Sequence, residues 1–134
     1  MSLARVLTFN GSYGGSFSGT VVTDNNGTIT TSSLPGSGVT NTSVQLAVSN
    51  GVVTVSVPGV TGTGTGTIDA EGNITGTVTF QSDGLTVTVH FVGKAIQTTT
   101  GDVITDTWSY TENYGGGIVV SGSGVWNVSD TTTA

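Results

Sequence analysis

The 134-residue sequence contains no cysteine, two prolines and only ten charged residues, of which eight are acidic and two are basic. Without cysteine the chain can form no disulfide, and it offers no thiol nucleophile or thiolate metal ligand. The net charge of −6 excludes a nucleic-acid partner, because two cations cannot neutralise a phosphate backbone. No apolar run approaches the roughly 18 residues of a membrane-spanning helix, so we expect no membrane insertion.

Residues that favour helices are also scarce. Alanine, leucine, glutamine, glutamate, methionine, lysine and arginine supply 18 residues together, whereas glycine, threonine, valine and serine supply 84. Valine and threonine are branched at Cβ, which stiffens the side chain and favours strands. The composition therefore excludes a helical bundle and any α/β fold with amphipathic helices, and it predicts a single all-β domain over residues 1–134.

Short turn sequences separate the predicted strands and determine which residues face each other. Asn50-Gly51 favours a two-residue hairpin that sets Val48 opposite Val53. Further turns are predicted at 70–72, 83–84, 101–102 and 113–115. The turn at 83–84 sets Phe80 opposite Val87. Across all five turns, the large apolar side chains stay on one face of the sheet.

The last two turns place the residues that matter most for function. The turn at 101–102 sets Gln97 opposite Asp106, and the turn at 113–115 sets Trp108 opposite Val120. In this register Asp106 and Trp108 lie on the same, apolar face of their strand, because they are two residues apart.

The pattern predicts seven strands over about 43–128, preceded by strands at Ala4–Phe9, Tyr13–Thr23 and Thr28–Ser32. An open meander of this length would leave two long exposed edges, which favour aggregation. We therefore predict an antiparallel up-and-down meander of about 8–10 strands that closes into a small β-barrel, with a two-sheet β-sandwich as the alternative. A solenoid would need equal repeats, and the turn spacing is irregular.

Glycines interrupt the apolar face at positions that the same register sets opposite large side chains or opposite each other. They are Gly62, Gly64, Gly66, Gly76, Gly93, Gly122 and Gly124. A glycine weakens a strand, so its presence needs a structural reason. One interpretation is that small and large side chains alternate to fill a narrow barrel, and the other is a lumen left open for a ligand.

Asp106 is the one acidic residue that the register places among large apolar side chains. A carboxylate on a buried face needs a partner or water, so a structural Asp106 would bond to Gln97, to water, or lie at the barrel mouth. As a functional residue it would be the polar anchor of an aromatic-lined cavity. The candidate ligand-binding residues are Asp106, Trp108, Tyr110, Gln97 and Trp126, with Arg5 as a counter-ion.

Residues typical of catalysis or metal binding do not form a recognisable site. His90, the single histidine, falls on the outward threonine face, and the segment 69–80 lacks the glycine and glutamate of a calcium loop. No G-x-S-x-G elbow is present. We therefore expect no catalytic residue, no metal and no cofactor.

The leading functional hypothesis is a non-enzymatic barrel that holds a neutral or weakly cationic small ligand, or a sugar stacked on Trp108, Tyr110 or Tyr114. The alternative is a structural or adhesion module with a filled core and no small-molecule site. An enzyme ranks third, because it would require Asp106 with a raised pKa beside a tyrosine or Arg5.

The composition also suggests where such a protein acts. A chain rich in threonine, serine and glycine and poor in lysine resembles secreted or surface proteins of bacteria and phages, so we expect an extracellular or cell-surface location. No export signal is visible after Met1, and we expect that one has been removed. In composition and topology, the glycine-rich strands and the segment Gly122–Trp126 resemble secreted bacterial up-and-down barrels of the streptavidin kind.

Overall fold

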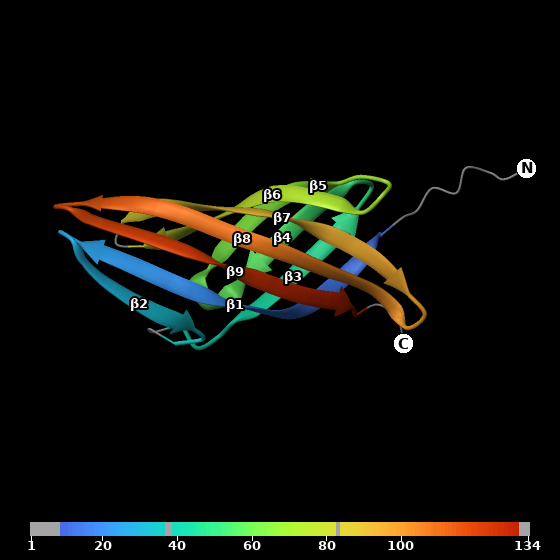
Figure 1. Cartoon of the computed structure of the whole chain (residues 1–134). Coiled ribbons are helices and arrows are strands. Elements are labelled where there is room, and N and C mark those ends of the chain that lie inside the picture. Colours follow the sequence, from blue (N-terminus) through green and yellow to red (C-terminus); the bar gives the residue numbers. More distant parts are fainter. Residues whose placement is uncertain (1–8, 37–38, 83, 132–134) are drawn as a thin grey trace, which may run out of the picture.

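The computed structural model describes residues 9–36, 39–82 and 84–131, and it is an antiparallel barrel of eight strands with a ninth strand on its wall (Figure 1). The strands are β1 Gly11–Asn25, β2 Thr28–Leu34, β3 Ser43–Ser49, β4 Val52–Val57, β5 Gly62–Ile68, β6 Asn73–Ser82, β7 Leu85–Thr98, β8 Gly101–Gly115 and β9 Ile118–Asp130. The predicted all-β barrel is therefore confirmed. In the described part of the chain no helix is long and apolar enough to cross a membrane.

Strand β1 closes the barrel, because one of its edges pairs with β9 along most of its length, from Tyr13 to Asn25. Its other edge is divided between two strands. Residues 11–16 pair with β3, and residues 19–25 pair with β2. Strands β3 to β9 then follow in sequence order, each bonded to the next. The predicted strand Ala4–Phe9 lies outside the described residues except for Phe9, which is buried but not part of a strand.

The predicted register of the early hairpins is confirmed. Val48 opposes Val53 in the β3–β4 hairpin, and Phe80 opposes Val87 in the β6–β7 hairpin. The turn at Asn50-Gly51 has φ of 51° and 82°, as the two-residue hairpin with positive φ at both positions requires.

The predicted register of the β7–β8 hairpin is wrong. Thr98 pairs with Gly101, so the chain turns at 99–100, two residues earlier than predicted, and Gln97 opposes Asp102 instead of Asp106. The run of threonines before Gly101 offers several turn positions of similar quality, and the sequence does not distinguish among them. The partner moves by an even number of residues, so every side chain stays on its predicted face.

The predicted register of the β8–β9 hairpin is wrong for a similar reason. Three consecutive glycines, 115–117, all have positive φ, and the tight turn uses the last two of them. As a result Trp108 opposes Gly124 and not Val120. This shift is also even, so Trp108 remains inside the barrel.

The glycines of the inner face lie beneath aromatic rings. A Cβ on Gly76 would be 2.4 Å from Cζ of Phe91, and a Cβ on Gly122 would be 2.3 Å from Cε1 of Tyr110. Real Cβ atoms do not approach other atoms this closely, so only glycine allows each ring to lie flat on the barrel wall. These glycines therefore let aromatic rings pack against the wall, both where the interior is filled and, at Gly122, beside the space described below.

The interior differs between the two ends of the barrel. The half that contains the β3–β4, β5–β6 and β7–β8 hairpins, called the closed half here, is packed with buried side chains that include Phe9, Tyr13, Ile74 and Ile104. The Tyr13 hydroxyl donates a hydrogen bond of 2.6 Å to the Phe9 carbonyl. The half with the β1–β2, β6–β7 and β8–β9 hairpins, called the open half, contains the space described below.

Strand β2, which is added to the wall of the barrel, is expected to be the strand least protected against hydrogen exchange. Among the described residues it pairs with β1 alone, and Ile29 on it is 59% exposed. We expect amides of β2 that bond to β1 to exchange with deuterium roughly tenfold faster than amides of β9 that bond to the same strand. Hydrogen exchange measured by NMR checks this, and equal protection of the two strands would contradict it.

Candidate functional site

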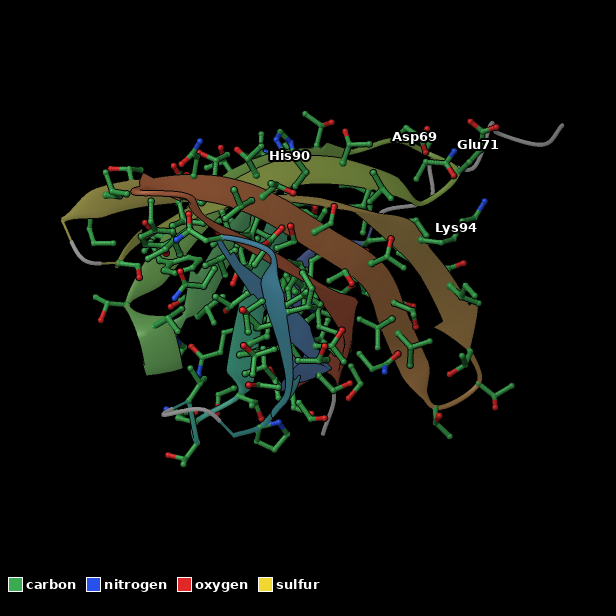
Figure 2. The ribbon with its side chains drawn as sticks, turned by 60° about the vertical axis from the view of Figure 1, so that its left-hand side comes forward. Asp69, Glu71, His90 and Lys94 are labelled. Atoms are coloured by element: carbon green, nitrogen blue, oxygen red, sulfur yellow. The ribbon has the colours of Figure 1, made fainter. Side chains whose placement is uncertain are left out.

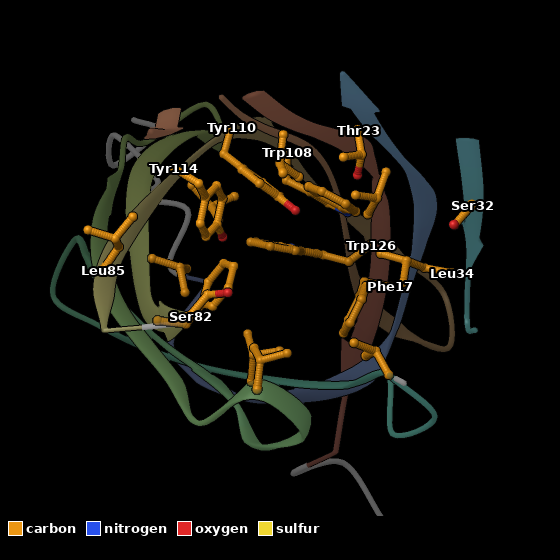
Figure 3. A pocket seen from close by; sticks show the side chains of 18 of the residues that line it. Phe17, Thr23, Ser32, Leu34, Ser82, Leu85, Trp108, Tyr110, Tyr114 and Trp126 are labelled. Carbon is orange, nitrogen blue, oxygen red and sulfur yellow. The ribbon is translucent and has the colours of Figure 1, made fainter. Parts of the chain in front are cut away.

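The open half of the barrel contains a cavity of about 780 Å³ (Figure 3). Strands β1, β6, β7, β8 and β9 form most of its wall, and β2 contributes Ser32 and Leu34. Six of the nine aromatic residues of the chain line it, namely Phe17, Phe80, Trp108, Tyr110, Tyr114 and Trp126. The aromatic side chains are therefore concentrated at one end of the lumen.

Contacts between the rings hold much of this lining in place. Trp108 and Tyr110 are nearly parallel, with 12° between their planes and 6.3 Å between their centroids. Phe17 meets Trp108 edge to face at 6.1 Å, and Phe80 meets Tyr110 in the same way at 5.9 Å. Both geometries are favourable for aromatic pairs, so the wall is largely formed before any ligand arrives.

Trp108 lies flat against the wall because two glycines face it. It pairs with Gly124 on β9, which in turn pairs with Gly19 on β1. A Cβ on Gly19 would be 2.6 Å from Cζ2 of the Trp108 ring. The indole Nε1 donates to the Val125 carbonyl at 3.3 Å, which uses its one polar group and leaves an apolar face for the cavity.

The rest of the lining is aliphatic or carries hydroxyl groups. Thr23, Ser32 and Ser82 supply hydroxyls, and none of the described residues that line the cavity is charged at neutral pH. Burial and the neighbouring Tyr114 raise the pKa of Tyr110 above its ordinary value, which keeps its phenol neutral. The cavity therefore offers a ligand apolar surface and a few neutral hydrogen-bonding groups.

Asp106 is on the inner face of β8 but does not line the cavity, and it has no exposed surface. It sits between Gly93 on β7 and Trp126 on β9, and Trp126 Nε1 donates to its Oδ2 at 2.8 Å. Its Oδ1 has no hydrogen-bond partner in the described part of the chain, and a Cβ on Gly93 would be only 1.7 Å from that atom. Burial raises the pKa of Asp106 to about 6, although the hydrogen bond from Trp126 opposes the shift.

The structure brings together three of the six predicted site residues in the cavity wall, Trp108, Tyr110 and Trp126. Asp106 contacts the site through Trp126 and does not itself line the cavity. Gln97 is exposed and opposes Asp102, because the β7–β8 turn differs from the predicted one. Arg5 lies outside the described residues.

Sequence reasoning missed the part of the site that β1 supplies. Phe17 shares an inner face with Tyr13, four residues earlier, and that spacing was a usable signal for an inward residue. Its neighbour across the strands is Trp126, which is 109 residues away in sequence. Only the pairing of the first strand with the last brings these residues together.

His90 and the acidic residues of the predicted turn at 70–72 are on the outside of the barrel. His90 is exposed on the outer face of β7, and Asp69, Glu71 and Lys94 are exposed near the β5–β6 hairpin (Figure 2). Hydrogen bonds from Asn73 lower the pKa of Asp69, as expected of a carboxylate that stabilises a turn. Over 9–36, 39–82 and 84–131 no group of three or more potential metal ligands is close enough to hold an ion.

Comparison of the chain with protein-family models, with curated proteins and with solved structures found no match. The class that fold and site define is a β-barrel with an aromatic-lined cavity at one end. Its function has to be inferred from the chemistry of that cavity.

Proposed function

We propose that this chain is a non-enzymatic binding protein whose barrel holds an uncharged, largely apolar small molecule. The observation that carries the proposal is the cavity of about 780 Å³, which six aromatic side chains line and to which the described residues contribute no charged side chain. Cavities of roughly 300–1,000 Å³ with apolar walls and a few polar groups are typical of small-molecule sites. The rings are held by one another and by glycine backbone, so little order has to be gained on binding.

The lining favours an uncharged, apolar ligand over a cation or a sugar. A cation would need a counter-charge in the wall, and the nearest buried carboxylate, Asp106, is behind Trp126. A sugar would need several strong hydrogen-bond partners, whereas the wall offers the hydroxyls of Thr23, Ser32 and Ser82 and of two tyrosines. Thr23 and Ser82 are near the ends of their strands, so a polar group of the ligand would lie toward the opening.

A structural or adhesion module is the second candidate, and it would have a filled interior. The packed closed half of the barrel favours that reading, whereas the unfilled open half favours binding. An extracellular or cell-surface location remains part of the proposal, and it rests on the composition alone.

Two matched fluorescent probes test the proposal. N-phenyl-1-naphthylamine is neutral, and 1-anilinonaphthalene-8-sulfonate is its sulfonated anion. We expect the neutral probe to bind saturably with enhanced emission and the anion to bind roughly tenfold more weakly, because the described part of the wall offers no cation to a buried charge. Absence of saturable binding of the neutral probe would overturn the proposal.

A matched pair of glycine variants tests whether the probe occupies the cavity. In Gly122→Ala the three atoms nearest to the new Cβ all belong to the Tyr110 ring, so we expect the ring to be displaced into the lumen. In Gly14→Ala the new Cβ meets only Thr131 Cγ2, at 3.4 Å, on the outside of β1. We expect roughly fivefold weaker probe binding for Gly122→Ala and no change for Gly14→Ala. Equal binding by both variants would place the probe elsewhere.

A further inference from the structure

The buried carboxylate of Asp106 has no role in the wall of the cavity, and yet it holds one of the residues that form that wall. Trp126 is 3% exposed and rests on Phe91, with 5.0 Å between ring centroids and 49° between their planes. Figure 3 shows Trp126 extending from the wall into the lumen, with Trp108 and Phe17 on either side. The single polar atom of its ring, Nε1, donates to Asp106 Oδ2 at 2.8 Å.

We propose that Asp106 is a positioning residue that fixes the Trp126 indole as part of the ligand cavity, and that its ionisation makes ligand affinity depend on pH. This inference rests on the proposed function. It assigns Asp106 no contact with the ligand, because the carboxylate acts through Trp126.

The two tryptophans of the site differ in a way that isolates this role. Trp108 donates to the backbone carbonyl of Val125, which cannot titrate, so its anchorage is the same at every pH. Trp126 donates to a carboxylate, and a hydrogen bond to an ionised acceptor is roughly twice as strong as one between neutral groups. Loss of the charge therefore weakens the hold on Trp126 and leaves Trp108 unaffected.

Space for the carboxylate is built into the neighbouring strand. Oδ1 occupies the position that any Cβ at residue 93 would take, and it finds no partner in the described part of the chain. Neither protonation state of Asp106 makes all its hydrogen bonds there. In the ionised form Oδ1 has no donor, and in the protonated form a hydroxyl at Oδ1 has no acceptor. A buried polar group that breaks the packing rule in this way is expected where function requires it.

Among the described residues, no other charged group contributes to the pKa shift of Asp106. Burial raises the pKa of Asp106 to about 6, and the hydrogen bond from Trp126 lowers it and so opposes the shift. The described titratable side chains of the surrounding strands lie on the outer face of β7 or away from Asp106 along the barrel. His90 and Lys94 are outside, Tyr110, Glu112 and Tyr114 are toward the open end, and Tyr13, Asp102 and Asp130 are toward the closed end. Between about pH 5 and pH 7 the hold on Trp126 therefore responds to the proton on Asp106 itself.

The role of Asp106 is tested first without any ligand. In a Trp108→Phe background Trp126 is the single tryptophan, so the emission comes from the indole that donates to Asp106. We expect its emission maximum and its quenching by acrylamide to titrate with a midpoint near pH 6. Adding Asp106→Asn, which keeps an oxygen acceptor but no charge, should make both signals constant over the same range. A pH profile shared by the two proteins would overturn the inference.

The consequence for the ligand is tested with N-phenyl-1-naphthylamine in the protein that retains both tryptophans. We expect its affinity to fall roughly fivefold between about pH 7.5 and pH 4.5. We expect Asp106→Asn, which carries no charge, to bind at both values with about the weaker affinity that the wild type has at pH 4.5. Asp106→Leu, which has no acceptor, should bind weakly at every pH; if it does not fold, the Asn variant still decides. Equal pH profiles for the wild type and Asp106→Asn would overturn the coupling.

The two proposals fail in different ways. If the neutral probe does not bind the wild type at any pH, the proposed function fails, whereas the emission of Trp126 still reports whether Asp106 controls it. If the probe binds and the emission does not titrate, the cavity is a binding site and Asp106 is only a structural residue.

Discussion

The free energy of unfolding should fall by roughly 2–3 kcal/mol between about pH 4 and pH 8 because of Asp106 alone. Burial raises the pKa of this group from 3.8 to about 6 in the folded state, so the folded chain binds more protons than the unfolded chain between these values. The stabilisation from the bound proton is complete below about pH 3.8 and is lost as the pH rises through 6. A carboxylate with a lowered pKa, such as Asp69, contributes with the opposite sign.

Urea denaturation of the wild type and of Asp106→Asn at several pH values checks this expectation. The other ionisable groups are common to both proteins, so the difference between their unfolding free energies isolates Asp106. We expect the difference to change across the window from about pH 4 to pH 6 and to be constant above about pH 7. A difference that is the same at all pH values would mean that Asp106 titrates normally.

Gly93→Ala should destabilise the barrel by about 3 kcal/mol or more, a large effect for the addition of one methyl group. The new Cβ would lie 1.7 Å from Asp106 Oδ1 and 2.3 Å from the Thr105 carbonyl oxygen. A flexible side chain could move aside, but the Thr105 oxygen belongs to the paired backbone of β8. Relief of the contact therefore requires the two strands to separate.

Two controls separate this contact from the general effect of removing a glycine. Gly14→Ala, which meets only Thr131 at 3.4 Å, should be neutral or stabilising by about 0.5 kcal/mol, because it reduces the entropy of the unfolded chain. Combining Gly93→Ala with Asp106→Ala should recover part of the loss, since one of the two obstructing groups is removed. Equal stability of Gly93→Ala and Gly14→Ala in thermal or urea unfolding would contradict the packing argument.

The inner glycines connect the stability of the barrel with the shape of its cavity. Gly122 and Gly19 allow Tyr110 and Trp108 to lie flat along β9 and β1, which leaves the centre of the open half unfilled. In the closed half Phe91 lies over Gly76 in the same manner, but other buried side chains fill the centre. Glycines beneath aromatic rings are therefore found both in the packed core at one end and around the aromatic-lined cavity at the other.

The sequence by itself determined that this chain is an antiparallel β-meander and which side chains point inward, whereas the pairing of β1 with β9 decided for a barrel over a sandwich. Composition excluded helices, and turns such as Asn50-Gly51 set an alternation that persisted even where the turn was misplaced. Both register errors were even, so Asp106 and Trp108 were correctly predicted to be inside. Side-chain direction follows a period of two, and it is a local property of the strand.

Only the tertiary structure decided what surrounds those inward residues. Partners across strands depend on which of several similar turns forms, and this choice replaced Gln97 with Gly93 opposite Asp106. Phe17 reaches Trp126 because β1 pairs with β9, a contact between distant parts of the chain that no local pattern encodes. Whether a lumen is filled or open depends on the sum of side-chain volumes around the closed wall, and this sum exists only once the barrel is closed.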